Sequence, residues 1–403
     1  MHGSGDLARL QDAEKPHAVN DHGKMKNIAV LGATGSIGRS AAAVIAANPT
    51  RFRLYAAAAR KSSDELLHQC AELHPAIAAL TDENAARDTA KQLPAGVKML
   101  SGDDSLVEVA TLPEVDVVLC AVTGIAGLRA VIAALRAGKR VALASKEVMV
   151  MAGDLVNAIP TGEIVPVDSE HSGVFQCLAG RPKSEISRVM LTASGGAFRS
   201  WPQERIAAAT VDDALKHPVW SMGVKVTVDS ATLMNKAFEL IEARHLFGLR
   251  PEQLGAVIHP QSVVHALVEL CDGSAIAQLA NPDMKLAIQY ALSYPERLDV
   301  RPAGTLDLAK LGKLEFSAPD MKRFPALAVG KLAMERGGAA PAVLNAANEA
   351  AVEAFVRRAI RLPRIWELVA EALEHCGKTD DGTLESRFAA DADARRYVTE
   401  HIG

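Results

Sequence analysis

Gly32-Ala33-Thr34-Gly35-Ser36-Ile37-Gly38 is the stretch of sequence that decides the fold. It lies between an apolar run at Lys26–Leu31, which predicts a strand, and Ile37–Ala47, which predicts a helix. Glycines in such a turn let the backbone approach a pyrophosphate, and the free N–H groups of the helix N-terminus favour an anion. The spacing Gly-x-x-Gly-x-x-Gly departs from the strict dinucleotide fingerprint, so a structural glycine turn is the alternative.

The end of the second predicted strand, Phe52–Ala58, indicates which dinucleotide this turn would bind. Sites for NADH often carry an acidic residue here, which binds the ribose 2′-hydroxyl. In this chain Arg60 and Lys61 follow the strand, and no acid occurs before Asp64. Because an arginine can bind a 2′-phosphate through two hydrogen bonds, the sequence favours NADPH. The alternative is a solvated basic turn.

Working outward, apolar strands and helical periods alternate as far as about Ser172. This alternation predicts a Rossmann-like, doubly wound parallel sheet. The further predicted strands are 76–80, 98–100, Val115–Ala121, Arg140–Ala144 and Ile164–Val167, and the further helices are Ser63–Leu73 and Gly127–Ala137.

After Ser172 the regular alternation of strands and helices stops, and the sequence predicts a central α+β domain and then a helical bundle. The predicted strands there are Arg188–Thr192, Ala256–His259, Val263–Leu270 and Ala275–Leu279, and the predicted helices are Ser230–Phe247 and Met284–Ser293. Proline and glycine mark Asp299–Pro319 as a linker. Three helices are predicted after it, at Ala326–Glu335, Pro341–Ala359 and Pro363–His375. The predicted division is therefore 25–172, 173–298, a linker at 299–322, and 323–403, preceded by a disordered extension or leader at 1–24 with Met25 as the natural start.

Composition excludes several classes of function. A formal net charge of −4 over 403 residues gives no general basic field, so we expect no nucleic-acid partner. No apolar run is long enough to span a bilayer, and the N-terminus lacks the apolar segment of a secretory signal. The five cysteines are scattered without a Cys-x-x-Cys pair, which predicts reduced thiols in a cytoplasmic protein.

Two groups of polar residues suggest a metal. In Val167-Asp168-Ser169-Glu170-His171, an extended chain would place Asp168 and Glu170 on the same side. Two neighbouring carboxylates repel unless a cation lies between them, and oxygen ligands suit Mg²⁺ or Mn²⁺. Asn235, Lys236 and Glu239 share one face of a predicted helix and could bind a phosphate and a metal together. The alternatives are a surface pair at a strand end and a solvent-facing Lys–Glu pair.

Two loops complete the candidate site. Ser194-Gly195-Gly196 follows a predicted strand and offers hydroxyl and backbone N–H donors to a phosphate. His217–Gly223 contains a large aromatic residue and ends in glycine, which is typical of a lid that excludes water. The alternative for His217 is a loop residue without a role.

These motifs occur together in an order that resembles the 1-deoxy-D-xylulose 5-phosphate reductoisomerase family. The resemblance covers Met25–Gly403 and rests on Gly32–Gly38, Ser145-Lys146-Glu147, Val167–His171, Leu191–Phe198, His217–Gly223, Val228–Glu242, His259–His265 and Leu344–Glu349. It implies a homodimer in the bacterial cytoplasm, with the NADPH-binding domain at 25–172 and the catalytic domain at 173–298. It also implies a two-stage reaction of the non-mevalonate isoprenoid pathway. Metal-assisted rearrangement of 1-deoxy-D-xylulose 5-phosphate comes first, and NADPH reduction then gives 2-C-methyl-D-erythritol 4-phosphate.

The resemblance also implies roles for individual residues. The ligands of a Mn²⁺, Mg²⁺ or Co²⁺ ion would be Asp168, Glu170 and Glu239. The substrate would contact Lys146, Ser169, Ser194, His217, Trp220, Ser230, Asn235, Lys236 and His265. NADPH would contact Thr34, Gly35, Ser36, Ile37, Arg60, Lys61, Ser145, Glu147, Met222 and Gly223. Ser145 departs from the family pattern, which has asparagine at this position, so one cofactor contact would be shorter or water-mediated.

Two rival functions remain to be distinguished. A semialdehyde dehydrogenase can also begin with a Gly-Ala-Thr-Gly turn, but it needs a nucleophilic cysteine. None of the five cysteines lies in a glycine-rich turn, and only Cys376, in a terminal helix, has a neighbouring histidine. A non-catalytic NADPH sensor would not need three carboxylates beside a phosphate site.

Overall fold

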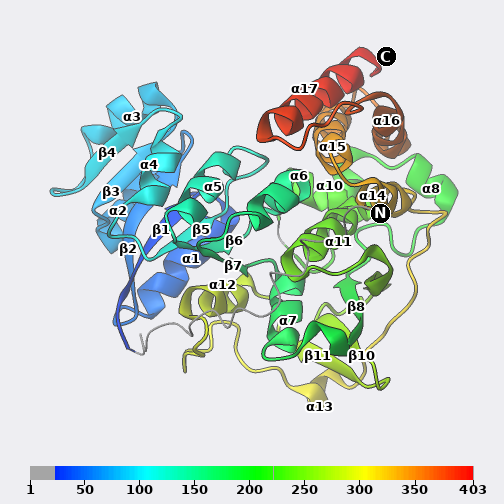
Figure 1. Ribbon diagram of the computed structural model, residues 1–403, viewed down its shortest axis with the longest axis horizontal. Coiled ribbons are helices and arrows are strands. Elements are labelled where there is room, and N and C mark those ends of the chain that lie inside the picture. The colour runs from blue at the N-terminus through cyan, green and yellow to red at the C-terminus, as the bar shows by residue number, and fades with distance from the viewer. Residues whose placement is uncertain (1–22, 221, 403) are drawn as a thin grey trace, which may run out of the picture.

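The computed structural model describes residues 23–220 and 222–402. Its N-terminal part is a parallel sheet of seven strands in the order β4-β3-β2-β1-β5-β6-β7 (Figure 1). The strands are β1 Lys26–Leu31, β2 Phe52–Ala59, β3 Ile77–Leu80, β4 Lys98–Ser101, β5 Val117–Cys120, β6 Arg140–Leu143 and β7 Glu163–Pro166. The connecting helices are α1 Ser36–Ala47, α2 Ser63–Leu73, α3 Glu83–Ala90, α4 Ser105–Thr111, α5 Leu128–Arg136 and α6 Lys146–Asn157.

The glycine turn lies where this sheet reverses its strand order. The chain runs outward from β1 to β4 and returns to β5 on the other side of β1, which is where ligands bind in such sheets. Gly32 has φ +87°, and a Cβ there would lie 2.4 Å from the carbonyl oxygen of Ala121. A Cβ on Gly38 would lie 2.3 Å from the carbonyl oxygen of Ala33. These two glycines are therefore required by close packing at the turn.

The central part contains a four-stranded sheet in the order β11-β10-β8-β9. Strands β8 and β9 are parallel, and the other pairs are antiparallel. The strands are β8 Ile186–Ala193, β9 Leu254–Ile258, β10 Val264–Leu270 and β11 Ala275–Leu279. The helices and 3₁₀ turns of this part are α7 Ser169–Leu178, η1 Lys183–Glu185, α8 Gln203–Ala207, α9 Val211–Ala214, α10 Val224–Thr232, α11 Met234–Phe247 and η2 Pro251–Gln253.

The chain then returns to the first sheet before it forms the C-terminal bundle. Helix α12, Met284–Ser293, packs against α1, and its Ile288 and Leu292 join the core below the parallel sheet. The stretch 299–322 holds the short α13, Leu308–Leu311, and runs along the outside of the molecule (Figure 1). In the bundle, α15 packs against α14, α16 and α17. The bounds of these helices are α14 Ala326–Arg336, α15 Ala340–Val356, α16 Leu362–His375 and α17 Leu384–Glu400.

The predicted fold class is confirmed, with local corrections. The single helix predicted at Ser230–Phe247 is wrong, because the chain forms α10 and α11 with a break at Leu233. Leu233 is 3% exposed and has a left-handed backbone with φ +63°, so burial in the core outweighs its poor preference for that conformation. The helices that were not predicted are α3, α4, α6, α7, α8, α9, α13 and α17.

The predicted N-terminal extension and the expected absence of a membrane-spanning helix can be compared with the described residues. Nearly all of the expected disordered extension lies outside the described residues, so it stays a prediction. Within 23–220 and 222–402, no helix combines the length and the apolar character needed to cross a bilayer.

Candidate active site

A pocket of about 230 Å³ is lined by the turn at the start of α1 and by elements of the central part. The N-terminal part contributes residues at the starts of α1 and α6, and the central part contributes the start of α7 and the end of β8 together with α10 and α11. Fifteen of the residues predicted for the site line this pocket: Ser36, Ile37, Lys146, Asp168, Ser169, Glu170, Ser194, His217, Trp220, Met222, Gly223, Ser230, Asn235, Lys236 and Glu239.

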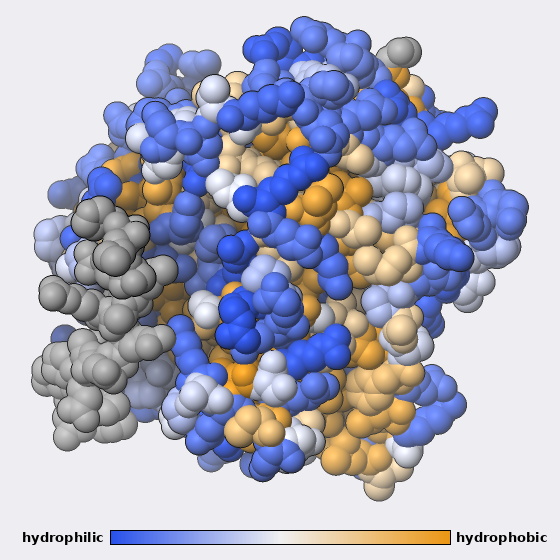
Figure 2. All heavy atoms as spheres, turned by 45° about the vertical axis from the view of Figure 1, so that its right-hand side comes forward, coloured by the Kyte–Doolittle hydropathy of each residue, from blue (hydrophilic) through white to orange (hydrophobic). Residues whose placement is uncertain are grey.

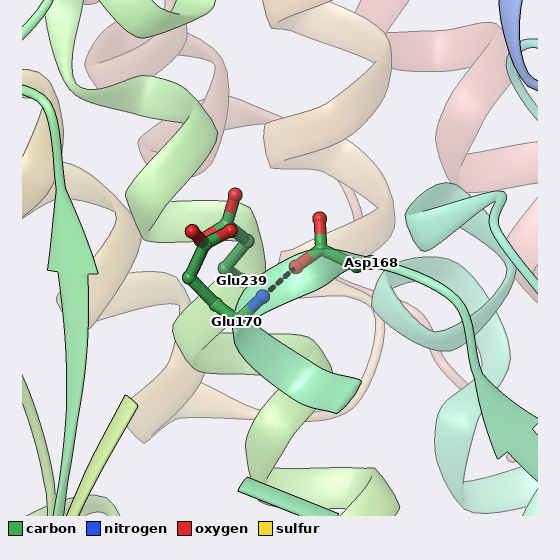
Figure 3. Close-up of side chains that lie close together, drawn as sticks. All are labelled: Asp168, Glu170 and Glu239. Atoms are coloured by element: carbon green, nitrogen blue, oxygen red, sulfur yellow. Dashed lines mark hydrogen bonds between the residues drawn. The ribbon is translucent and has the colours of Figure 1, made fainter. Parts of the chain in front are cut away.

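Three carboxylates converge in the pocket (Figure 3). Oxygen atoms of Asp168, Glu170 and Glu239 all lie within 4.8 Å of one another. The first two come from the β7–α7 junction, and Glu239 comes from the second turn of α11. Three converging oxygen ligands match the preference of a hard divalent cation, so this donor set fits Mg²⁺ or Mn²⁺.

The extended conformation predicted for Asp168 and Glu170 is wrong. Asp168 caps α7, and its Oδ1 accepts hydrogen bonds from the backbone N–H groups of Glu170 at 3.1 Å and His171 at 3.4 Å. Glu170 therefore lies in the first turn of a helix, close to Asp168 because the chain curls rather than because it extends. An aspartate after a strand and before Ser-Glu-His is a helix N-cap signal, and it could have predicted this turn.

Two lysine ammonium groups lie among these carboxylates. Lys146 Nζ is 3.1 Å from Asp168 Oδ2, 3.1 Å from Glu239 Oε1 and 2.8 Å from Asn235 Oδ1. Lys236 Nζ contacts Glu239 and lies 4.0 Å from Glu170 Oε2. Lys236 is 4% exposed and Glu239 is 1% exposed, so the alternative of a solvent-facing Lys–Glu pair is wrong.

The charges in this cluster shift one another's pKa values. Burial alone would lower the pKa of Lys146, but Asp168 and Glu239 hold it well above the ordinary value. Burial alone would raise the pKa of Asp168, but Lys146 and His171 hold it well below. For Glu239, burial raises the pKa although Lys236 and Lys146 oppose it. A nearby divalent cation would stabilise the ionised form of a buried carboxylate of this kind.

His171 and Glu242 form a buried layer behind the carboxylates that the sequence did not indicate. His171 Nδ1 is 3.1 Å from Asp168 Oδ1 and 3.3 Å from Glu242 Oε2, and its Nε2 is 2.9 Å from the backbone oxygen of Glu239. Burial alone would lower the pKa of His171, but Glu242 and Asp168 raise it to about 9. The charged ring holds Asp168 in place, as partners behind metal ligands commonly do. The spacing Glu239-x-x-Glu242, which places two carboxylates on one face of a helix, could have indicated this second layer from the sequence.

The Ser194–Gly196 turn forms the opposite wall of the pocket. Ser194 Oγ accepts from the N–H of Gly196 at 3.1 Å and lies 2.9 Å from His217 Nε2. A Cβ on Gly196 would lie 2.4 Å from the backbone oxygen of Ser230, so only glycine lets this turn approach α10 so closely. Ser194 and Ser230 thereby line the same cavity.

The tautomer of His217 follows from its partners. Its Nδ1 accepts from the N–H groups of Val219 at 3.2 Å and Trp220 at 2.8 Å. In the neutral ring Nε2 therefore carries the proton and donates to Ser194. Burial lowers the pKa of His217, which favours this neutral form. Ser221, in the same loop, lies outside the described residues.

Seven of the predicted site residues do not line the pocket. His265 lies behind Glu170, with Nδ1 3.6 Å from Glu170 Oε1, and lines an adjoining smaller pocket. Ser145 donates to the backbone oxygen of Val122 at 2.5 Å, and Glu147 pairs with Lys225 at 3.4 Å. The remaining four lie in the glycine turn or at the exposed end of β2: Thr34, Gly35, Arg60 and Lys61.

A dinucleotide-type sheet beside a pocket of carboxylates and lysines defines a class, the metal-dependent oxidoreductases that bind a dinucleotide. Family models agree with this class and narrow it. The model of 1-deoxy-D-xylulose 5-phosphate reductoisomerase matches residues 28–153, and two models of the C-terminal domains of this enzyme match 164–247 and 279–397.

Relatives and solved structures support the same family. The 1-deoxy-D-xylulose 5-phosphate reductoisomerase of Moorella thermoacetica is 48% identical over 92% of this chain and 97% of its own. That of Anaeromyxobacter dehalogenans is 46% identical over 94% and 98%. The solved structure of the enzyme from Zymomonas mobilis in complex with NADPH has a TM-score of 0.88 and 39% identity, over 94% of this chain and 99% of that one. A structure of DOX-P reductoisomerase in complex with NADPH, fosmidomycin and magnesium also has a TM-score of 0.88, with 41% identity over 94% and 98%. The chain belongs to the 1-deoxy-D-xylulose 5-phosphate reductoisomerase family, which confirms the resemblance seen in its motifs.

Proposed function

We propose that the protein converts 1-deoxy-D-xylulose 5-phosphate to 2-C-methyl-D-erythritol 4-phosphate by rearrangement and reduction with NADPH. The observation that carries this proposal is the convergence of Asp168, Glu170 and Glu239 beside a dinucleotide-type turn. Neither feature alone indicates an isomerising reductase, but both open onto the same pocket. Family membership at 46–48% identity with enzymes of this name supports the same reaction.

Asp168, Glu170 and Glu239 would hold the divalent cation, for which Mg²⁺, Mn²⁺ and Co²⁺ are all suitable. When bound, the cation supplies Lewis-acid polarisation of two substrate oxygens and holds them in one orientation. Lys146 Nζ lies within 3.1 Å of two of these carboxylates, so it would donate to the same substrate oxygens. Ser169 lines the pocket beside the metal ligands and would contact the substrate there, and His265 would orient Glu170 from behind.

The substrate phosphate would lie between the Ser194 turn and α10–α11. Ser194, Ser230 and Asn235 offer uncharged donors, and Lys236 offers a buried charge. His217 would donate from Nε2, because its Nδ1 is held by two backbone N–H groups. Trp220 and Met222 line the same pocket and would exclude water from it.

NADPH would lie across the C-terminal edge of the parallel sheet. Thr34, Gly35, Ser36 and Ile37 belong to the turn and first helical residues that would face the pyrophosphate. Arg60 and Lys61 would bind the 2′-phosphate from the exposed end of β2. The other proposed cofactor contacts are Ser145, Glu147, Met222 and Gly223.

The test is to follow the absorbance of NADPH with 1-deoxy-D-xylulose 5-phosphate as substrate. We expect oxidation in the presence of Mg²⁺ or Mn²⁺ and its loss in excess chelator. If NADPH binds but is not oxidised with this substrate, the non-catalytic sensor becomes the better reading. NADPH oxidation that continues in excess chelator would contradict the proposed need for a divalent metal.

We also propose that the protein is a cytoplasmic homodimer of the non-mevalonate isoprenoid pathway, with the domain division predicted from its sequence. Support for the dimer is that Leu308, Leu314 and Phe316 of the 299–322 stretch are 39–58% exposed. Figure 2 shows apolar side chains gathered at one edge of the face in view, although most of that face is hydrophilic. Sedimentation of the protein as a single chain would contradict the dimer.

A further inference from the structure

Helix α15 buries polar side chains that contribute nothing directly to the pocket. Asn345 and Asn348 are 0% exposed, although most of their neighbours on α15 are alanine, valine and leucine. A buried amide is unfavourable unless its hydrogen bonds are made. Among the described residues, none of the C-terminal bundle at 323–402 lines the pocket. Asn345 donates to Glu349 on its own helix at 3.4 Å, so it is the buried amide of Asn348 that needs another explanation.

Asn348 holds a buried carboxylate on α10. Its Nδ2 donates to Asp229 Oδ1 at 2.8 Å, and Asp229 is 1% exposed. The other oxygen of this carboxylate, Oδ2, lies 2.9 Å from Lys225 Nζ, one turn earlier on α10. The Lys225 contact lies within α10, so it is the hydrogen bond from Asn348 that requires α10 to keep its position against α15.

Lys225 extends the same chain of contacts to α6. Its Nζ lies 3.4 Å from Glu147 Oε1 and 4.5 Å from the centre of the Phe238 ring. Burial alone would lower the pKa of Lys225, but Asp229 and Glu147 raise it, so the ammonium group stays charged. Glu147 follows Lys146 directly, and Lys146 lies among the three carboxylates. Asn348, Asp229, Lys225 and Glu147 therefore connect the bundle, α10 and α6.

Helix α10 is the element that this chain of contacts would position. It carries Val226 and Ser230 into the pocket, and its N-cap is Gly223. It has nine residues and ends at the left-handed Leu233, so its own hydrogen bonds do little to fix its direction. A small rotation of α10 would move Ser230 away from Ser194 on the opposite wall.

We propose that Asp229 and Asn348 are positioning residues, which fix α10 against α15 so that Ser230 meets the substrate phosphate. This inference rests on the proposed function for the identity of the substrate. It assigns the C-terminal bundle a part in substrate binding, although the bundle touches no substrate. The competing explanation is that the Asp229–Asn348 contact only stabilises the fold.

The experiment compares Asp229→Asn, Asn348→Asp and the double variant that exchanges the two residues. Asn348→Asp places two carboxylates face to face, whereas the double variant restores one amide and one carboxylate. Val343→Ala is the control, because Val343 is a buried residue of α15 that lies beside Gly377. The readouts are KM and kcat for 1-deoxy-D-xylulose 5-phosphate, KM for NADPH, Tm, and amide hydrogen exchange across 224–232 without substrate.

We expect KM for the sugar phosphate to rise about tenfold in Asn348→Asp, with a smaller change in kcat and in KM for NADPH. Exchange across α10 should become faster in both single variants, and the double variant should recover part of the loss, because residue 229 then lacks the carboxylate that pairs with Lys225. Val343→Ala should lower Tm without changing KM. The inference is overturned if the single variants lower Tm but leave both α10 exchange and KM unchanged. Because exchange needs no turnover, it tests the inference even if the parent protein does not use this substrate.

Discussion

At the scale of single residues, Asp168 both starts a helix and contributes to the site. Its Oδ1 caps α7 and contacts His171, while its Oδ2 faces Lys146 at 3.1 Å. Because the cap fixes the first turn of α7, Glu170 is brought toward Glu239 on another element. A change at Asp168 would therefore disturb both the charge of the site and the start of α7. Glu239 caps no helix, so a substitution there tests the charge alone.

Glu239→Gln should remove most turnover while NADPH still binds. The amide keeps the shape of the side chain but cannot supply a carboxylate ligand, so we expect a loss of about a hundredfold or more. Steady-state turnover and NADPH fluorescence measure the two properties separately. Glu252→Gln is the control, because the Glu252 side chain is 77% exposed on the surface. Normal turnover in Glu239→Gln would contradict the metal assignment.

Arg60→Ala with Lys61→Ala should narrow the preference for NADPH over NADH. Both residues are exposed at the end of β2, and removing them takes two cations from the proposed 2′-phosphate site. A fall in the ratio of kcat/KM values of about tenfold to a hundredfold is expected. Arg87→Ala, on α3, serves as the control for the loss of a surface charge. An unchanged ratio would show that other residues bind the 2′-phosphate.

At the scale of elements, α11 is held by close contact with its neighbours. On one side it carries Lys236 and Glu239 into the pocket, and on another it packs against α14. Gly330 of α14 meets Ala237 of α11 so closely that a Cβ on Gly330 would lie 2.2 Å from Ala237 Cβ. Glycine is therefore needed at this crossing, because a real Cβ would push the helices apart.

Gly330→Ala should destabilise the protein by about 2 kcal/mol through overpacking at this crossing. Thermal or denaturant unfolding measures the change. Adding Ala237→Gly should restore part of the loss, since it removes the other atom of the clash. Leu332→Ala on the same helix is the control, because Leu332 is 40% exposed. If the double variant is no more stable than Gly330→Ala alone, the clash is not the cause.

At the scale of the whole molecule, the three parts meet around His245. This residue lies on α11, and its ring packs against Gly153 of α6 so closely that a Cβ there would lie 2.4 Å from His245 Cγ. Arg387 of α17 is 1% exposed and pairs with Asp154 of α6 at 2.8 Å and with Asp380 at 2.7 Å. Helices from the N-terminal, central and C-terminal parts are thus joined in one place.

The pH dependence of stability should report on this junction. Burial lowers the pKa of His245 from 6.5 to about 4, with Asp154 opposing the shift and Arg244 and Arg387 adding to it. The unfolded chain therefore binds more protons between these two values, so stability is present above pH 6.5 and falls as the pH drops toward 4. The shift corresponds to a loss of up to about 3 kcal/mol.

His245→Gln should flatten the fall in Tm over this pH range, because the variant has no imidazole to protonate. His68→Gln is the control, since the His68 side chain is 74% exposed. Parallel plots of Tm against pH for the parent protein and His245→Gln would show that His245 does not cause the fall in stability.

Local features of the sequence determined much of this protein. The glycine turn, the strands of the parallel sheet and helices such as α2 and α12 were predicted because they depend on patterns within a few residues. Asn235, Lys236 and Glu239 were placed together correctly because the helical period fixes their common face. The family could also be named, because many short motifs occur in one order.

Only the tertiary structure decided which distant residues meet. It brought Glu239 to Asp168 and Glu170, His171 to Glu242, and Asn348 to Asp229, across separations that no local pattern spans. It also broke the helix at Leu233 and curled the chain at Asp168, against the simplest reading of each stretch. The physical reason is that backbone preferences act within a turn of helix or a strand, whereas burial and buried charge pairs are settled only when the whole chain packs.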